Sequence, residues 1–162
     1  MELWDAYDRD GNKLDRHLPR DEPIPDGQYH LVVHVIVRHE DDEYLLMRRD
    51  ESKLYYPGFW ETGAAGAVLK DESPIDGAKR ELYEETGIAS DELKAIDRQV
   101  SHDTIYMTYL CITDIQKDSV TIQPGETSAY RWVSRDKLIE AMNCDDFVGI
   151  VRERSAAYMH KI

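Results

Sequence analysis

The stretch GAVLKDESPIDGAKRELYEETGI, residues 66–88, carries the strongest structural signal in the chain. Its second half predicts a helix over residues 74–86. Ser73 suits the N-cap and Pro74 the first helical position. Gly87 suits the left-handed conformation that ends many helices. The sequence therefore defines both ends of this helix.

One face of this helix is apolar and is bordered by acids. With residues placed 100° apart, four side chains fall on a single stripe that predicts packing against a sheet: Ile75, Ala78, Leu82 and Thr86. Glu81, Glu84 and Glu85 border that stripe. Like charges at these spacings cost a helix roughly 0.2–0.5 kcal/mol per pair, and Arg80 can hold the carboxylate of Glu84 one turn later. A solvated charged face is the usual interpretation, but these glutamates border the buried stripe instead of opposing it.

The segment TGAAGAVLKDE, residues 62–72, precedes the helix and is expected to be a glycine-containing loop. Such a loop would bring backbone carbonyls close to the glutamates. Mg²⁺ binds about six oxygen ligands at roughly 2.0–2.1 Å. Carboxylates and a carbonyl gathered at one point therefore predict a hard-cation site, in which the metal neutralises the acidic cluster.

The spacing of these residues resembles the Nudix box at every defined position. Gly66 is followed after five residues by Glu72 and after seven more by the run RELYEETGI, residues 80–88. The resemblance covers about residues 28–145. It implies an α/β fold of the α+β type, the Nudix α/β/α sandwich with a mixed sheet. It also implies Mg²⁺ or Mn²⁺ as cofactor and a small-molecule diphosphate, linked to another moiety, as substrate.

The same resemblance implies roles for individual residues by their position in the box. Glu81, Glu84 and Glu85 would bind the metal, and Ala65 would contribute its carbonyl. Glu81 and Glu84 would also act in catalysis, Glu81 as the candidate base. Arg80 would orient a glutamate. A hydrolase of this kind needs neutralised phosphoryl charge, an activated water and a group to accept its proton.

Residues outside the box add candidate substrate contacts. Arg49 and Lys53 precede an aromatic loop and would grip phosphates, while Tyr56 and Trp60 would stack on a flat group. The alternative is that the aromatics belong to the core and the cations are solvated. Glu126 is a further candidate metal ligand or base, because Nudix enzymes often place an acid in this region; the alternative is a plain loop acid.

Other stretches resemble isopentenyl diphosphate isomerases and hydrolases related to them. They are WDAYDRDGNKL, YHLVVHVIV and YPGFWETGAAGA. The isomerase carries a cysteine acid/base, a glycine and a metal-binding histidine where this chain has Ala65, Gly66 and Ala67. Its Glu-X-Glu pair is also absent from DTIYMTYLCI, residues 103–112. A pyrophosphohydrolase is therefore favoured, with an isomerase-like enzyme or a non-catalytic ligand-sensing domain as the alternatives.

Length, net charge and cysteine content limit the classes of protein to which the chain can belong. Its 162 residues predict a single domain, with a hairpin and loop over 1–27, a core over 28–145 and a C-terminal helix over 146–162. The net charge of −13 argues against nucleic acid and anionic membranes as partners. Two unpaired cysteines and the lack of a signal peptide predict the cytoplasm. Dimers are common among Nudix relatives, so a homodimer paired through the hairpin is compatible with the chain.

Further elements follow from periodicity and composition. Apolar β-branched runs predict the strands YHLVVHVIVRH, DEYLLMRR, DTIYMTYLCITDI, VTIQ and SAYRWVS. The segment SRDKLIEAM predicts a short helix with Ser134 as its N-cap. Strands, one helix, more strands and then helices are typical of a mixed sandwich and not of a doubly wound sheet.

Overall fold

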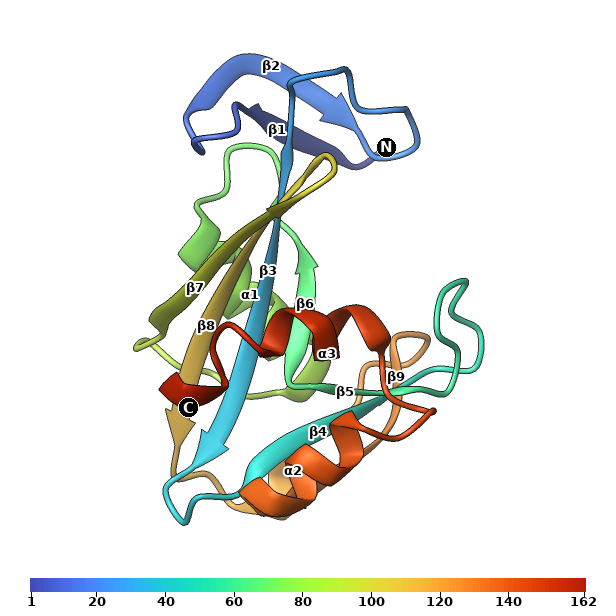
Figure 1. Ribbon diagram of the computed structural model, residues 1–162, viewed down its shortest axis with the longest axis vertical. Helices are drawn as coiled ribbons and strands as arrows, with labels where there is room; N and C mark the ends of the chain where they lie inside the picture. The colour runs from blue at the N-terminus through green and yellow to red at the C-terminus, as the bar shows by residue number, and fades with distance from the viewer.

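The structure is a computed structural model that describes residues 1–162. Figure 1 shows the path of the chain. The strands are β1 (Leu3–Tyr7), β2 (Lys13–Pro19), β3 (His30–His39), β4 (Tyr44–Arg49), β5 (Trp60–Thr62), β6 (Ala64–Ala67), β7 (Lys94–Ser101), β8 (Thr104–Thr113) and β9 (Thr127–Val133). The α-helices are α1 (Pro74–Thr86), α2 (Arg135–Met142) and α3 (Gly149–Ser155), with 3-10 turns at Lys117–Ser119 and Met159–Lys161.

The larger sheet is mixed, as the sequence predicts. Strand β3 runs parallel to β8 along its whole length, from the pair His30 and Thr104 to the pair His39 and Thr113. Its other edge takes β6 in antiparallel pairing. Strand β4 joins this arrangement at the end of β3 and pairs antiparallel with both β5 and β9. Strand β6 therefore lies beside β3, and helix α1 contacts both strands.

Alternation along β3 builds a core on each face of the sheet. Val33, Val35 and Val37 belong to the cluster that packs against Ala78 and Leu82 of α1. Ile36 points to the opposite face, where a second cluster contains the buried side chains of α2, α3 and the C-terminal segment: Leu138, Ala141, Met142, Val151 and Tyr158. Helices thus cover both faces (Figure 1), which confirms the predicted α/β/α sandwich.

Helix α1 begins and ends where the sequence predicts. The Oγ atom of Ser73 accepts a hydrogen bond from the backbone N–H of Asp76 at 3.2 Å. Gly87 adopts φ 75°, and its N–H donates to the carbonyl of Tyr83 at 2.8 Å. These caps satisfy backbone groups that the helix itself leaves free. The caps therefore define the first and last turns of the helix.

The N-terminal hairpin forms a separate two-stranded sheet of β1 and β2, at the top of Figure 1. Backbone hydrogen bonds join it to the rest of the molecule: two of 2.9 Å between Tyr7 and Tyr29, and one of 2.8 Å from the N–H of Lys70 to the carbonyl of Leu3. Trp4, Ala6 and Leu18 form a small buried cluster in it, against which Ala67 and Leu69 pack. This packing places the beginning of the chain beside β6 and the segment that leads into α1.

Several predicted elements are wrong in type or extent. The segment 120–123 is not a strand: Val120 is buried in the core and Thr121 donates its N–H to the carbonyl of Thr86. The segment 62–72 is not wholly a loop, because it contains β6. Strand β7 has no counterpart among the predicted strands, because charged residues interrupt the apolar pattern of this edge strand.

The predicted C-terminal helix is also too long. Only Gly149–Ser155 is α-helical. After Ser155 the chain turns so that Tyr158 and Ile162 enter the core, with exposed fractions of 0% and 8%. A continuous helix is lost because burial of these two side chains sets the backbone path there. None of the helices combines the length and apolar composition needed to cross a membrane.

A buried histidine on β3 predicts a loss of stability in acid. His34 is 1% exposed, and its Nε2 atom lies 2.9 Å from the carbonyl oxygen of Thr62. Burial, and then the charge of Arg154, lower the pKa of His34 from 6.5 to about 4, although the bond to Thr62 opposes this shift. Below pH 6.5 the unfolded chain therefore takes up a proton that the folded chain does not accept until about pH 4.

Because of His34, we expect the free energy of unfolding to fall by about 3 kcal/mol as the pH drops from 6.5 to about 4. Denaturant unfolding at pH 7 and pH 4.5 measures the loss, and His34→Gln should have a shallower dependence on pH. His102→Asn, in the exposed turn after β7, is the matched control and should keep the dependence of the wild type. Equal slopes for wild type and His34→Gln would contradict the prediction.

Candidate active site

A cavity of about 520 Å³ lies where the N-terminal hairpin, β6, α1 and two loops meet. Charged and polar side chains dominate its lining. The lining residues are Glu2, Trp4, Arg20, Arg49, Lys53, Ala65, Gly66, Ala67, Leu69, Arg80, Glu81, Glu84, Glu85, Gln123 and Glu126. The three glutamates from α1, Arg80, Ala65, Arg49, Lys53 and Glu126 are thus brought together from segments far apart in the sequence.

Arg80 organises the acidic side of this cavity. Its Nε and Nη2 atoms donate to the carboxylate of Glu72 at 2.8 and 3.0 Å, and Nη2 also donates to the carbonyl of Ala67 at 2.9 Å. Its Nη1 atom donates to Glu81 at 2.7 Å and to Glu84 at 3.3 Å. A guanidinium has five N–H donors, and these contacts engage all of its nitrogens. Arg80 is therefore a fixed centre of positive charge among three carboxylates.

Gly66 allows the backbone of β6 to approach Glu81. A Cβ atom at this position would lie 2.0 Å from Oε1 of Glu81, far inside the contact distance. Glu81 itself is mostly enclosed, with 13% of its side chain exposed, whereas Glu84 is 43% exposed. The glycine in the motif thus leaves the space that the Glu81 carboxylate occupies beside the strand.

Glu85 lies in the least favourable electrostatic position of the three. Its carboxylate accepts a hydrogen bond from the backbone N–H of Ala65 at 3.2 Å. Burial, and then the negative charges of Glu61 and Glu81, raise the pKa of Glu85 well above its usual value, and Glu126 adds to the effect. Burial also raises the pKa of Glu81, against the opposing charge of Arg80. The cavity therefore contains more negative charge than its own cations balance.

The predicted substrate contacts divide into two pairs. Arg49 and Lys53 line the cavity, each held by an acid: Arg49 donates to Glu61 at 2.8 Å, and Lys53 forms an ion pair with Glu126. Tyr56 and Trp60 are not among the lining residues.

The two aromatic side chains pack elsewhere. The ring of Tyr56 lies 5.5 Å from that of Phe59. Trp60 packs against the second core cluster, with the guanidinium of Arg131 4.3 Å from its ring centroid. Neither ring lines this cavity: the backbone of Trp60 pairs in β5, and its side chain packs as the alternative in the sequence analysis has it.

The donor chemistry of the cavity fits a hard divalent cation. Glu81, Glu84, Glu85 and Glu126 offer carboxylate oxygens, and the backbone at Ala65 lies beside them. Such oxygen ligands suit Mg²⁺, and a cation would relieve the repulsion that raises the pKa of Glu85. These carboxylates line one cavity, but no three acidic, histidine or cysteine side chains are arranged so that they could hold a metal ion between them. Each carboxylate instead has its own protein partner: Arg80, the Ala65 N–H or Lys53.

Several residues of the site have no role in the sequence interpretation. The charge of Glu61 raises the pKa of Glu85, yet Glu61 lies outside the box in sequence, so no local pattern marks it. Glu72 belongs to the motif spacing, and the structure shows that its carboxylate holds Arg80. Glu2, Trp4 and Arg20 reach the cavity from the hairpin. No local pattern marks them, since their position depends on how the hairpin packs.

Comparisons with known proteins show the family and the fold. The family model described as NUDIX domain matches residues 28–149. An uncharacterized Nudix hydrolase of Listeria monocytogenes is 30% identical over 151 residues, covering 91% of this chain and 89% of that protein. An isopentenyl-diphosphate Delta-isomerase of Corynebacterium diphtheriae is 26% identical over 136 residues, covering 75% and 73% of the two chains.

A solved structure shares the fold over nearly the whole chain. The crystal structure of a Deinococcus radiodurans protein superposes with a TM-score of 0.78 at 17% identity, covering 97% of this chain and 99% of the other. The fold agreement therefore includes the N-terminal hairpin as well as the matched domain. With the family model covering most of the sequence and the motif residues gathered in one cavity, the chain belongs to the Nudix hydrolase family.

Proposed function

We propose that this protein hydrolyses a phosphoanhydride bond in an organic diphosphate, with Mg²⁺ or Mn²⁺ as cofactor. The observation that carries the proposal is the gathering of Glu81, Glu84, Glu85 and Glu126 around one polar cavity, with Arg80 at its edge. A cluster of carboxylates raises its own electrostatic energy unless a cation or a proton compensates it. A purely structural helix gains nothing from this arrangement.

Each residue of the cavity would have its own role in binding the cation and the substrate. Glu81, Glu84 and Glu85 would bind the cation, together with the Ala65 carbonyl and Glu126. When bound, the cation supplies neutralisation of the phosphoryl charge and lowers the pKa of a water. Glu81, enclosed beside Gly66, would accept the proton of the attacking water.

The cations of the cavity have distinct functions in this proposal. Arg80 would keep Glu81 and Glu84 in place, because its contacts to Glu72 and the Ala67 carbonyl fix its own position. Arg49 and Lys53 would bind phosphate oxygens. Both are already close to the cavity and exchange a carboxylate partner for a phosphate when the substrate enters.

An isomerase-like activity is the second candidate, because an isopentenyl-diphosphate Delta-isomerase is among the relatives. Isomerisation needs a proton donor and a proton acceptor on opposite faces of an alkene. Ala65 stands where the resemblance places the cysteine, and a methyl group carries no proton. Cys111 is buried in the core and Cys144 is exposed, and neither lines the cavity. The cavity therefore favours hydrolysis. A ligand-sensing domain would have no use for the full set of carboxylates.

Metal dependence is the direct test. We expect protein stripped with EDTA to cleave none of a panel of diphosphates, scored by the appearance of the two cleavage products, and Mg²⁺ or Mn²⁺ to restore turnover. The same assay run with isopentenyl diphosphate in D₂O distinguishes the two activities by NMR. Deuterium-labelled dimethylallyl diphosphate formed over many turnovers would show an isomerase. Full activity after thorough removal of metal would overturn the proposed role of the carboxylates.

A further inference from the structure

Part of the cavity wall comes from outside the residues matched by the family model. Glu2, which directly precedes β1, Trp4 on β1 and Arg20, which directly follows β2, line the same cavity as the glutamates of α1. The family match begins only at residue 28. The hairpin therefore adds three side chains to a site whose motif residues all lie elsewhere in the sequence.

These three side chains form a connected and fixed group. The two carboxylate oxygens of Glu2 accept separate hydrogen bonds, one from Nε1 of Trp4 and one from Nη1 of Arg20, each 2.9 Å long. The backbone N–H of Arg20 also donates to the carbonyl of Glu2 at 3.1 Å. The indole stacks on His30, with ring centroids 4.3 Å apart, and His30 in turn bonds to Thr104 at 2.8 Å.

Arg20 retains more free hydrogen-bonding capacity than the other cations of the cavity. Nη1 is its only side-chain nitrogen with a protein partner, and 59% of its side chain is exposed. In contrast, every nitrogen of Arg80 is engaged, Arg49 donates to Tyr55 and Glu61, and Lys53 is paired with Glu126. Beside the donors of Arg20, the carboxylate of Glu2 offers acceptors. A hydroxyl group, which both donates and accepts, matches this pair, whereas a further phosphate would be repelled by Glu2.

The remaining wall is poorly matched to a hydrocarbon. Only four of the fifteen lining residues are hydrophobic. These four are Trp4, Ala65, Ala67 and Leu69. A prenyl chain placed here would remove water from many polar groups without replacing their hydrogen bonds, which is costly. A hydroxylated group would supply those bonds.

We propose that Glu2, Trp4 and Arg20 form a specificity wall that recognises the hydroxyls of a sugar attached to the scissile diphosphate. These three side chains would therefore favour a hydroxylated group over a prenyl chain beyond the reacting phosphates. This inference rests on the proposed hydrolysis and assigns the group that is carried beyond the reacting phosphates. Trp4 acts as a positioning residue, because it holds Glu2 and is itself held by His30.

The test compares three anhydrides with Mg²⁺: ADP-ribose, dimethylallyl diphosphate and inorganic tripolyphosphate, which has no organic group. We expect wild-type kcat/KM for ADP-ribose to exceed that for dimethylallyl diphosphate by about 10-fold or more. Arg20→Ala should lower kcat/KM for ADP-ribose by about 10- to 100-fold, mainly through KM, because it removes charged hydrogen bonds made equally in the ground and transition states. The same variant should leave kcat/KM for dimethylallyl diphosphate and for tripolyphosphate unchanged.

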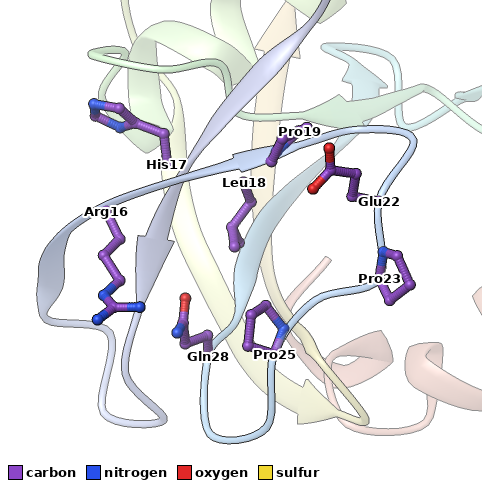
Figure 2. A pocket seen from close by; sticks show the side chains of 8 residues that line it. All are labelled: Arg16, His17, Leu18, Pro19, Glu22, Pro23, Pro25 and Gln28. Atoms are coloured by element: carbon purple, nitrogen blue, oxygen red, sulfur yellow. The ribbon is translucent and has the colours of Figure 1, made fainter.

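Arg16→Ala is the matched control. Arg16 is an exposed arginine on β2 and lines a separate cavity of about 310 Å³ between that strand and the following loop (Figure 2). Its loss should change none of the three rates. Glu2→Gln is a second variant that keeps the side-chain volume, and it should lower kcat/KM for ADP-ribose selectively.

The outcomes separate this inference from the proposed function. Hydrolysis of no anhydride by the wild type would overturn both. Hydrolysis with a preference for dimethylallyl diphosphate would overturn the specificity wall alone. So would variants of Arg20 and Glu2 that leave all three rates unchanged, or lower them equally. Selective loss with ADP-ribose, absent from Arg16→Ala, supports the assignment.

Discussion

Glu85→Gln is expected to lower diphosphate turnover by about 10² or more while leaving the protein folded, and Glu84→Gln should do the same. Each change replaces a carboxylate with an amide of nearly equal volume. It removes one charged oxygen ligand from the proposed cation site. The steady-state rate at which the two cleavage products form at saturating Mg²⁺ measures the loss.

The stability of the metal-free variants should not fall with their activity. Burial and neighbouring acids raise the pKa of Glu85, so its ionised form is held at a cost to the metal-free protein. We therefore expect the free energy of unfolding without metal to be unchanged or higher in Glu85→Gln. A structural glutamate would give the reverse pattern, with stability lost and activity kept.

Glu140→Gln provides the matched control for this pair. Glu140 is an exposed residue of α2 that pairs with Lys137 at 2.7 Å and does not line the cavity. Its turnover should equal that of the wild type. Wild-type turnover in Glu84→Gln and Glu85→Gln would show that the acidic face of α1 is only solvated, and the proposed function would then be wrong.

Gly63→Ala is expected to cause the largest loss of stability from a single methyl group. Gly63 lies between β5 and β6 with φ 56°, and an added Cβ would lie 1.8 Å from the backbone oxygen of Val35. That oxygen belongs to the central strand and cannot move without disturbing its pairing. Overpacking and left-handed strain each cost about 1–3 kcal/mol, so we expect a loss of about 3–5 kcal/mol.

Thermal and denaturant unfolding measure this loss, which corresponds to roughly 10 °C in Tm for a chain of this length. Gly27→Ala is the control, because Gly27 has φ 77° but no atom within 4 Å of the added Cβ. It should show only the cost of the left-handed conformation, about 1–2 kcal/mol. Equal losses in the two variants would show that the close approach of Val35 has no separate effect.

The helix and its acids show what local sequence can determine. The spacing of the apolar stripe, the cap residues and the glutamates all act within a few residues along the chain, and the structure confirms the helix over 74–86 with both caps. The strands β3, β4 and β8 are similarly predictable, because each is a continuous apolar run. Where the pattern is interrupted by charge, as in β7, or set by pairing with distant residues, as in β6, local signals fail.

The sequence by itself determined the family and the helix α1 with its carboxylates, because both depend on residue types at short spacings. Only the tertiary structure decided which cations and acids meet in one cavity and that the charge of Glu61 acts on Glu85. It also decided that Trp60 is used for packing and that the hairpin contributes Arg20. These facts depend on strand pairing and on how separate layers pack. Such long-range contacts arise from the burial of the whole chain, so no single segment encodes them.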